Sequence, residues 1–190
     1  MSLSNQSRQR LLAIAAKSIR HGLEHDEPAS VKIADLPEEL RATRATFVTL
    51  ERRKQLRGCI GMLEARFPLG VDVANNAFSA AFRDPRFPPL TKNEMEGLDI
   101  HISILSPPEP LPCKDEQDLL AKLRPNIDGL IIADGWYHAT FLPSVWEHLC
   151  DPRDFVTELK MKAGLAPDHW SKTLKVERYT TESVSHPKSI

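Results

Sequence analysis

The segment Gln55–Leu63 (QLRGCIGML) places Cys59 between two glycines within an apolar pattern that is typical of a strand. Glycine weakens a strand interior and usually marks a bulge or a close backbone approach. On a regular strand, Arg57 and Cys59 share one face, about 6.5–7 Å apart at two strand rises. A nearby guanidinium favours the thiolate form of a cysteine. We therefore interpret Cys59 as a candidate nucleophile or covalent carrier, with Arg57 as its partner.

A structural role is the alternative interpretation of Cys59. Free cysteine is among the most buried residue types, and it often packs as a small hydrophobic side chain. A reactive thiol needs a base, and His101 and His138 are candidates for that role. Spacing along the chain does not place either imidazole beside Cys59, so both interpretations stay open at this point.

Two further groups of side chains are candidate binding residues. Arg83 and Arg86 flank Asp84 in a short RDPR segment, and two guanidiniums in one turn can recognise an anion. A surface ion-pair network is the alternative for this segment. His138 and Thr140 share one side of a predicted β-ribbon, where we expect ordinary surface or an interface.

Composition and charge argue against several classes of function. Among 190 residues, Lys+Arg 25 balance Asp+Glu 26, which gives no electrostatic footprint for nucleic acid or a membrane surface. No apolar run approaches the ~20 residues that span a bilayer, and the first residues lack a secretory pattern. We expect a cytoplasmic chain whose three cysteines are free thiols. Phosphate-binding glycine loops, hydrolase elbows and zinc spacings are absent from the sequence, so it predicts no metal site and names no cofactor.

Periodicity and turn signals predict the elements that position these residues. We expect helices over 7–21, 68–82 and 116–123, a short helix over 142–149, and a helix between Asp151 and Gly164. We expect strands over 46–50, 56–63, 98–104, 130–133, 136–141 and 174–180. Hairpins join most of these strands and the helices are grouped between them, which favours an α+β fold with a mainly antiparallel sheet and flanking helices.

We also expect a particular turn in one hairpin and a polar stripe on one helix. The Asp134-Gly135 pair predicts a type I′ turn that places Ile131 opposite His138. On the helix over 68–82, a polar stripe either lines a groove or is simply exposed, and it consists of Asp72, Asn75, Asn76, Ser79 and Arg83.

The LRGCIG element at residues 56–61 resembles the hallmark of the AMMECR domain family. The resemblance continues in order through AAFRDPRFPPL (80–90), ISILSPP (102–108), DGL (128–130), ATFLPSVW (139–146) and KMKAGL (160–165). It implies an α+β fold with a larger and a smaller lobe. Residues 1–182 are then expected to form a single AMMECR-like domain of two lobes, followed by a frayed tail over 183–190.

The resemblance also implies partners. Bacterial and archaeal members are similar to the A component of the AmmeMemoRadiSam set, which pairs this domain with a Memo-type protein and a radical S-adenosylmethionine enzyme. A binding or accessory component follows, in which Gly58 and Gly61 allow close packing and Cys59 is structural. The alternative is a cysteine-dependent enzyme that acts through Cys59 and Arg57, with Arg83 or Arg86 binding an anionic small molecule. The oligomeric state does not follow from the sequence.

Overall fold

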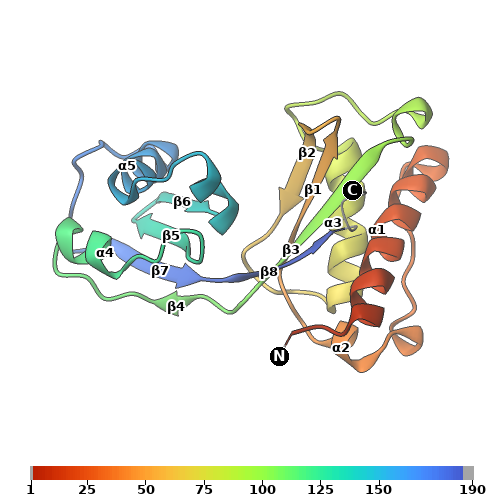
Figure 1. Ribbon diagram of the computed structural model, residues 1–190, viewed down its shortest axis with the longest axis horizontal. Coiled ribbons are helices and arrows are strands. Elements are labelled where there is room, and N and C mark those ends of the chain that lie inside the picture. Colours follow the sequence, from red (N-terminus) through yellow and green to blue (C-terminus); the bar gives the residue numbers. More distant parts are fainter. Residues whose placement is uncertain (1, 186–190) are drawn as a thin grey trace. The chain divides into compact units, whose positions relative to one another are not determined.

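The computed structural model describes residues 2–185, and these form two compact units. Among the described residues, unit 1 contains 2–105 and 182–185, and unit 2 contains Ser106–Thr181. Each unit has its own apolar core and its own four-stranded sheet. The strand pairings are antiparallel, so the predicted α+β class is confirmed (Figure 1).

Unit 1 is a sheet backed by two helices. Its strand order is β2-β1-β3-β8, and α1 and α3 lie side by side on one face of this sheet (Figure 1). The elements of this unit are α1 (Asn5–His25), α2 (Glu38–Arg41), β1 (Thr46–Arg52), β2 (Gln55–Gly61), α3 (Leu69–Phe82), β3 (Leu98–Leu105) and β8 (Thr181–Ser185), with short 3-10 helices at Ile33–Asp35 and Lys92–Glu94. Val48 and Leu50 of β1 point toward the helices with Ile100 and Ile102 of β3, as their alternation predicts.

Helix α1 is longer than its periodicity predicts. Ser4 caps it, its C-cap Asp26 is left-handed, and Gly22 lies inside the helix rather than at its end. A Cβ on Gly22 would lie 2.4 Å from the ring of Phe82 and 2.7 Å from that of Phe78. Gly22 is therefore a point of close approach between α1 and α3, and the predicted end of the helix at residue 21 is wrong because α1 continues to His25.

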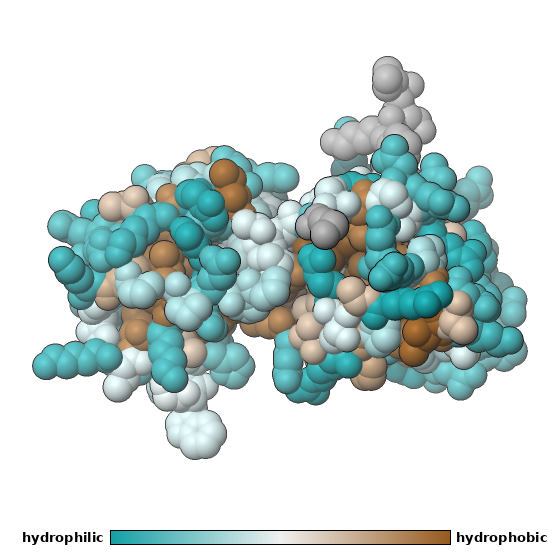
Figure 2. Space-filling view, turned by 90° about the horizontal axis from the view of Figure 1, so that it is seen from below, coloured by the Kyte–Doolittle hydropathy of each residue, from teal (hydrophilic) through white to brown (hydrophobic). Residues whose placement is uncertain are grey.

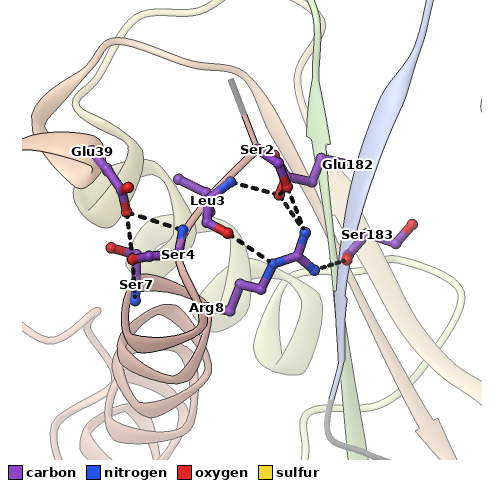
Figure 3. A network of polar contacts seen from close by, with 8 residues as sticks. All are labelled: Ser2, Leu3, Ser4, Ser7, Arg8, Glu39, Glu182 and Ser183. Atoms are coloured by element: carbon purple, nitrogen blue, oxygen red, sulfur yellow. Dashed lines mark hydrogen bonds and ion pairs between the residues drawn. The ribbon is translucent and has the colours of Figure 1, made fainter.

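Strand β8 ties the end of the described chain to unit 1. Arg8 of α1 donates to the carboxylate of Glu182 and, through Nη1, to the carbonyl oxygen of Ser183 at 3.0 Å (Figure 3). Val184 is buried in the core. A frayed tail from residue 183 is therefore wrong for 183–185, because backbone pairing and the Arg8 contacts hold them. Residues 186–190 of that predicted tail lie outside the described residues.

Unit 2 has the strand order β4-β7-β5-β6. Its core includes Trp146, which stacks on Phe155 with 3.8 Å between ring centroids. The elements are β4 (Glu109–Pro110), α4 (Glu116–Lys122), β5 (Gly129–Asp134), β6 (Tyr137–Phe141), the 3-10 helix Pro143–Glu147, α5 (Pro152–Ala163) and β7 (Lys175–Tyr179). Asp151 caps α5 and Gly164 ends it, as predicted.

The β5–β6 hairpin exists, but its predicted register is wrong. Asp134 pairs with Tyr137 and Ala133 with His138, so the two loop residues are Gly135 and Trp136. Gly135 alone of these two has a positive φ (60°), which fits a type II′ turn rather than type I′. Trp136 is 97% exposed at the turn.

The polar stripe on α3 is partly buried, which neither expectation for it foresaw. Asp72 and Asn76 are buried, and their side chains join Thr46 of β1. The Thr46 hydroxyl donates to Asp72 at 2.6 Å, and the Asn76 amide donates to the Thr46 carbonyl oxygen at 3.1 Å. Burial raises the pKa of the Asp72 carboxyl. These three residues therefore fix α3 to the sheet and do not line a groove.

Most of the face drawn in Figure 2 is hydrophilic, and apolar side chains reach that surface in small areas. Over residues 2–185, no helix combines the length and the apolar character that crossing a bilayer requires.

Candidate functional site

Cys59 lies on β2, which is an edge strand of the sheet in unit 1. Opposite β2, Leu50 pairs with Gly58 and Glu51 with Leu56, so Arg57 is an extra residue at a β-bulge. A bulge breaks the alternation of a strand and re-aims a side chain. The regular strand geometry from which the spacing of Arg57 and Cys59 is predicted is therefore interrupted at Arg57.

The two glycines of the LRGCIG element allow close approach within unit 1. A Cβ on Gly58 would lie 2.0 Å from the carbonyl oxygen of Ala80 on α3, and one on Gly61 would lie 2.3 Å from the carbonyl oxygen of Thr46. Neither position can accept a side chain without moving backbone. Gly58 sets how closely helix α3 packs on the edge strand that carries Cys59.

The RDPR segment clamps the backbone of Cys59. Asp84 Oδ2 accepts from the Cys59 N–H at 2.9 Å, and Arg86 Nη2 donates to the Cys59 carbonyl oxygen at 3.3 Å. Asp84 and Arg86 also pair with each other, at 2.7 Å between Oδ2 and Nη2. The Arg86 guanidinium and the amides of Cys59 and Arg86 hold the pKa of the Asp84 carboxyl well below its usual range. Together the two side chains make the hydrogen bonds to the Cys59 backbone that a neighbouring strand would make inside a sheet.

The thiol itself contacts a hydroxyl. Thr49 of β1 is the register partner of Cys59, and its Oγ1 lies 3.2 Å from the Cys59 sulfur. His101 of β3 is the next residue in the same row across the sheet, because it pairs with Thr49. Two strand spacings, about 10 Å, separate Cys59 from His101, so a proton could pass between them only through a bridging group such as Thr49.

His101 has a second neighbour. Its Nε2 lies 3.5 Å from Glu51 Oε2 and makes no hydrogen bond within residues 2–185. The other proposed base, His138, lies on β6 in unit 2. The row Cys59–Thr49–His101, with Glu51 beside the imidazole, is the part of the site that can support acid–base chemistry.

Arg57 is bound to a carboxylate instead of to the thiol. Its Nε and Nη2 donate to the two carboxylate oxygens of Glu94, at 2.7 and 3.1 Å. Glu94 also accepts from the N–H and hydroxyl of Thr91, which completes a capping box. Arg57 and Thr91 together lower the pKa of Glu94 to about 2. Sequence reasoning missed this pairing because the capping box accounts for Glu94 without a partner on β2.

The remaining predicted residues have other partners or other positions within their own units. Arg83 pairs with Asp26 at 2.8 Å on the surface, so it forms no joint anion site with Arg86. Thr140 in unit 2 donates to the Leu130 carbonyl oxygen and lies 2.9 Å from the Tyr179 hydroxyl. Burial raises the pKa of Tyr179 to about 12. His138 is exposed on the same ribbon. Within residues 2–185, no three His, Cys, Asp or Glu side chains are grouped to hold a metal ion.

Thr49 is the residue that sequence reasoning passed over. It occupies an outward position of a predicted strand, where threonine is common, and nothing in its neighbours marks it as a partner for a thiol. Only the β1–β2 register brings it opposite Cys59. Register depends on turn geometry and burial as well as on local sequence.

The geometry defines an α+β domain with a helix-backed sheet and a clamped cysteine on its edge strand. The AMMECR1 family model matches residues 12–184 of the chain. The crystal structure of the protein PH0010 from Pyrococcus horikoshii matches with a TM-score of 0.89 and 33% identity, and the match covers 96% of this chain and 93% of that one.

Archaeal sequences agree with that match. The chain is 40% identical over 167 residues to a protein of Methanothermobacter thermautotrophicus, which covers 87% of this chain and 86% of the relative. It is 38% identical over 156 residues to the protein MJ0810 of Methanocaldococcus jannaschii, which covers 80% and 78%. The chain belongs to the AMMECR1 family, as the resemblance predicts.

Proposed function

We propose that this chain is a cytoplasmic binding component that docks partner proteins, of the Memo and radical S-adenosylmethionine types, at the β2 edge of unit 1. The observation that carries the proposal is that the charged side chains of the LRGCIG and RDPR segments are paired with other groups of the protein. Arg57 is bound to Glu94, Asp84 to Arg86 and the Cys59 amide, and Arg83 to Asp26. The Arg57–Glu94 and Asp84–Arg86 pairs hold the β2 edge, while Arg83 is paired elsewhere on the surface of unit 1. An enzyme would instead be expected to direct some of them toward substrate.

Exposed apolar side chains give this edge a contact surface. Leu56 is 43% exposed on β2, and Met62, directly after β2, is 37% exposed. Methionine and leucine beside a rigid polar rim suit a protein partner, because binding energy at interfaces concentrates in a few apolar anchors. The choice of partner types follows from the family resemblance.

Titration of the purified chain with a purified Memo-type protein and a purified radical S-adenosylmethionine protein from the same genome tests this proposal. We expect Leu56→Asp and Met62→Asp each to weaken binding by roughly tenfold or more. Cys59→Ala should leave binding unchanged. Ile127→Asp, at a side chain of unit 2 that is 50% exposed, is the matched control. The proposal fails if neither protein binds, or if Ile127→Asp weakens binding as much as Leu56→Asp.

A cysteine-dependent enzyme is the second candidate, and one observation favours it. The Thr49 hydroxyl contacts the Cys59 sulfur at 3.2 Å, and Thr49 pairs with His101 on the next strand. Arg86, whose side chain is 55% exposed beside the clamp, is the cation that could meet an anionic substrate. Such a thiol would act as a nucleophile on an electrophilic carbon of that substrate.

The pH dependence of Cys59 alkylation decides between the two candidates. Cys113→Ser and Cys150→Ser remove the other two free thiols. A midpoint well below the ~8.5 of an ordinary cysteine, moved upward by Thr49→Val, would support the enzyme. Alkylation that needs unfolding would make Cys59 structural and leave the binding component as the function.

A further inference from the structure

Unit 1 contains a cavity that involves none of the residues discussed so far as a site. It has a volume of about 380 Å³ and lies between α1 and the segment 29–36. Small-molecule sites in proteins typically span ~300–1,000 Å³. The LRGCIG and RDPR residues are not part of its lining.

One wall of the cavity is a stripe on α1. Arg10, Ala13, Ile14 and Lys17 all line it, at the i, i+3, i+4 and i+7 spacing of one helix face. Ala13 leaves room between the two long cationic side chains, while Ile14 is buried and forms part of an apolar floor. The α1 wall therefore offers cations above an aliphatic surface.

The opposite wall is held in place at both ends. Ser18 of α1 is buried, accepts from the Ala29 N–H at 3.1 Å and donates to the Ala74 carbonyl oxygen at 2.7 Å. At the other end, Arg41 donates to the carbonyl oxygens of Leu36 and Ala34, at 2.7 and 3.0 Å. The cavity is thus preformed, which reduces the ordering cost of binding a ligand.

The cations of the lining form no ion pair with any of residues 2–185. Arg10, Lys17 and Lys32 line the cavity, and their side chains make no hydrogen bond or ion pair with any of residues 2–185. Most arginines of unit 1 are used differently: Arg8, Arg41, Arg44, Arg57, Arg66, Arg83 and Arg86 each bind a carboxylate or carbonyl oxygen. Three such cations over an apolar floor suit an organic anion.

The acidic and apolar residues of the lining restrict the kind of anion that the cavity can bind. Asp35 is the one acidic residue among the lining residues, so it disfavours a polyanion such as a nucleoside triphosphate. The lining contains no aromatic side chain on which a base could stack. Ile14, Ala29 and Leu36 are buried and aliphatic. A ligand with one or two negative charges and an aliphatic body fits these surfaces.

We propose that this cavity binds a small aliphatic carboxylate, with its head group at Arg10, Lys17 and Lys32 and its body on Ile14, Ala29 and Leu36. The site goes beyond the binding component at β2 and does not depend on it. Binding should weaken as salt rises, because the cations are exposed and therefore screened.

Titration of the ¹⁵N-labelled chain with octanoate tests the site. We expect saturable shifts of the amides of Ala13, Ala29 and Val31. Lys17→Gln and Arg10→Gln should each weaken octanoate binding by roughly three- to tenfold, as loss of one partly exposed charged contact predicts. Ala13→Trp should abolish binding by filling the cavity. Arg20→Gln, an exposed cation on α1 outside the lining, is the matched control.

Two further measurements separate recognition of the carboxylate from simple apolar binding and from events at β2. 1-Octanol should bind more weakly than octanoate, and Cys59→Ser should leave octanoate binding unchanged, so failure here is distinct from failure at β2. The proposal is overturned if octanoate gives no saturable shift at those amides, if 1-octanol binds equally well, or if Arg20→Gln matches Lys17→Gln. Should Ala13→Trp fail to fold, the charge variants still decide the outcome.

Discussion

The sheets of the two units protect an edge strand with different chemistry. At β2, a carboxylate and a guanidinium together take both backbone groups of Cys59, at 2.9 and 3.3 Å. At β6, an exposed cation on α5 takes a carbonyl oxygen: Lys162 Nζ lies 2.9 Å from the oxygen of Thr140. The first arrangement supplies a donor and an acceptor, as a neighbouring strand would, and the second supplies a donor.

This difference indicates that the β2 edge around Cys59 is held more firmly than the β6 edge. The Asp84 side chain is 2% exposed, so it is removed from water only because Arg86 and the Cys59 amide satisfy it. The Lys162 side chain meets solvent and could be replaced there by water. We infer that the β2 edge is fixed around Cys59 as part of the fold, while the contact at β6 is an addition to a strand that is already stable.

The largest expected effect comes from Gly58→Ala. The new Cβ would lie 2.0 Å from the Ala80 carbonyl oxygen, and this contact is with backbone, so α3 and β2 would have to separate. We expect a loss of about 3 kcal/mol in the free energy of unfolding. Gly135→Ala is the control, because its Cβ meets open space and only its positive φ of 60° is strained, at a cost of ~1–2 kcal/mol. Urea unfolding of both variants measures the difference, and equal losses would contradict the close-approach argument.

Asp84→Ala should have the next largest effect. It leaves the Cys59 N–H without its acceptor and Arg86 without its carboxylate. The expected cost is about 2–3 kcal/mol, since an unsatisfied buried donor loses its full desolvation energy. Hydrogen exchange of the Cys59 amide should accelerate more than that of Val48 in the neighbouring strand. Unchanged exchange at Cys59 would show that Asp84 does not clamp the edge.

Contacts between strands, such as those at Cys59, limit how much of the fold and the site the sequence could predict. The α+β class and the helix between Asp151 and Gly164 follow from local periodicity and capping, and both are confirmed. The bulge at Arg57, the shifted β5–β6 register and the contact of Thr49 with Cys59 depend on pairing between strands. One-residue shifts of register exchange the faces of a strand, so the residue types near Cys59 could be named from the sequence but their partners could not.

The loss of stability at acidic pH can be compared for one carboxylate of each unit. Arg57 lowers the pKa of Glu94 in unit 1 from 4.5 to about 2. In unit 2, Ser171, Thr173 and His169 lower that of Asp134 from 3.8 to about 2. A carboxyl whose pKa is lower in the folded state stabilises the fold above its unfolded pKa, and this contribution is lost as the pH falls through the folded pKa. Both contributions should therefore be complete above pH 4.5 and lost as the pH approaches 2.

Substitutions assign that acid transition to each unit. Glu94→Gln should flatten the fall in stability between pH 4.5 and about 2 as reported by signals of unit 1. Asp134→Asn should flatten it between pH 3.8 and about 2 as reported by Trp136, Trp146 and Trp170, which all lie in unit 2. Tryptophan fluorescence therefore follows unit 2, and amide signals of β1 follow unit 1. An unchanged acid limb in Glu94→Gln would mean that the Arg57–Glu94 pair is not what resists acid.

The smallest expected effect is that of Lys162→Met, which tests the other side of the comparison. The substitution removes the donor to Thr140 and the contact of the ammonium with the Phe141 ring, at 5.0 Å from its centroid. Methionine keeps most of the aliphatic stem, and water can reach the carbonyl oxygen that the lysine leaves. We expect a loss below about 1 kcal/mol. A loss as large as that of Asp84→Ala would mean that β6 needs its clamp as much as β2 does, and rigidity would then no longer distinguish the edge that carries Cys59.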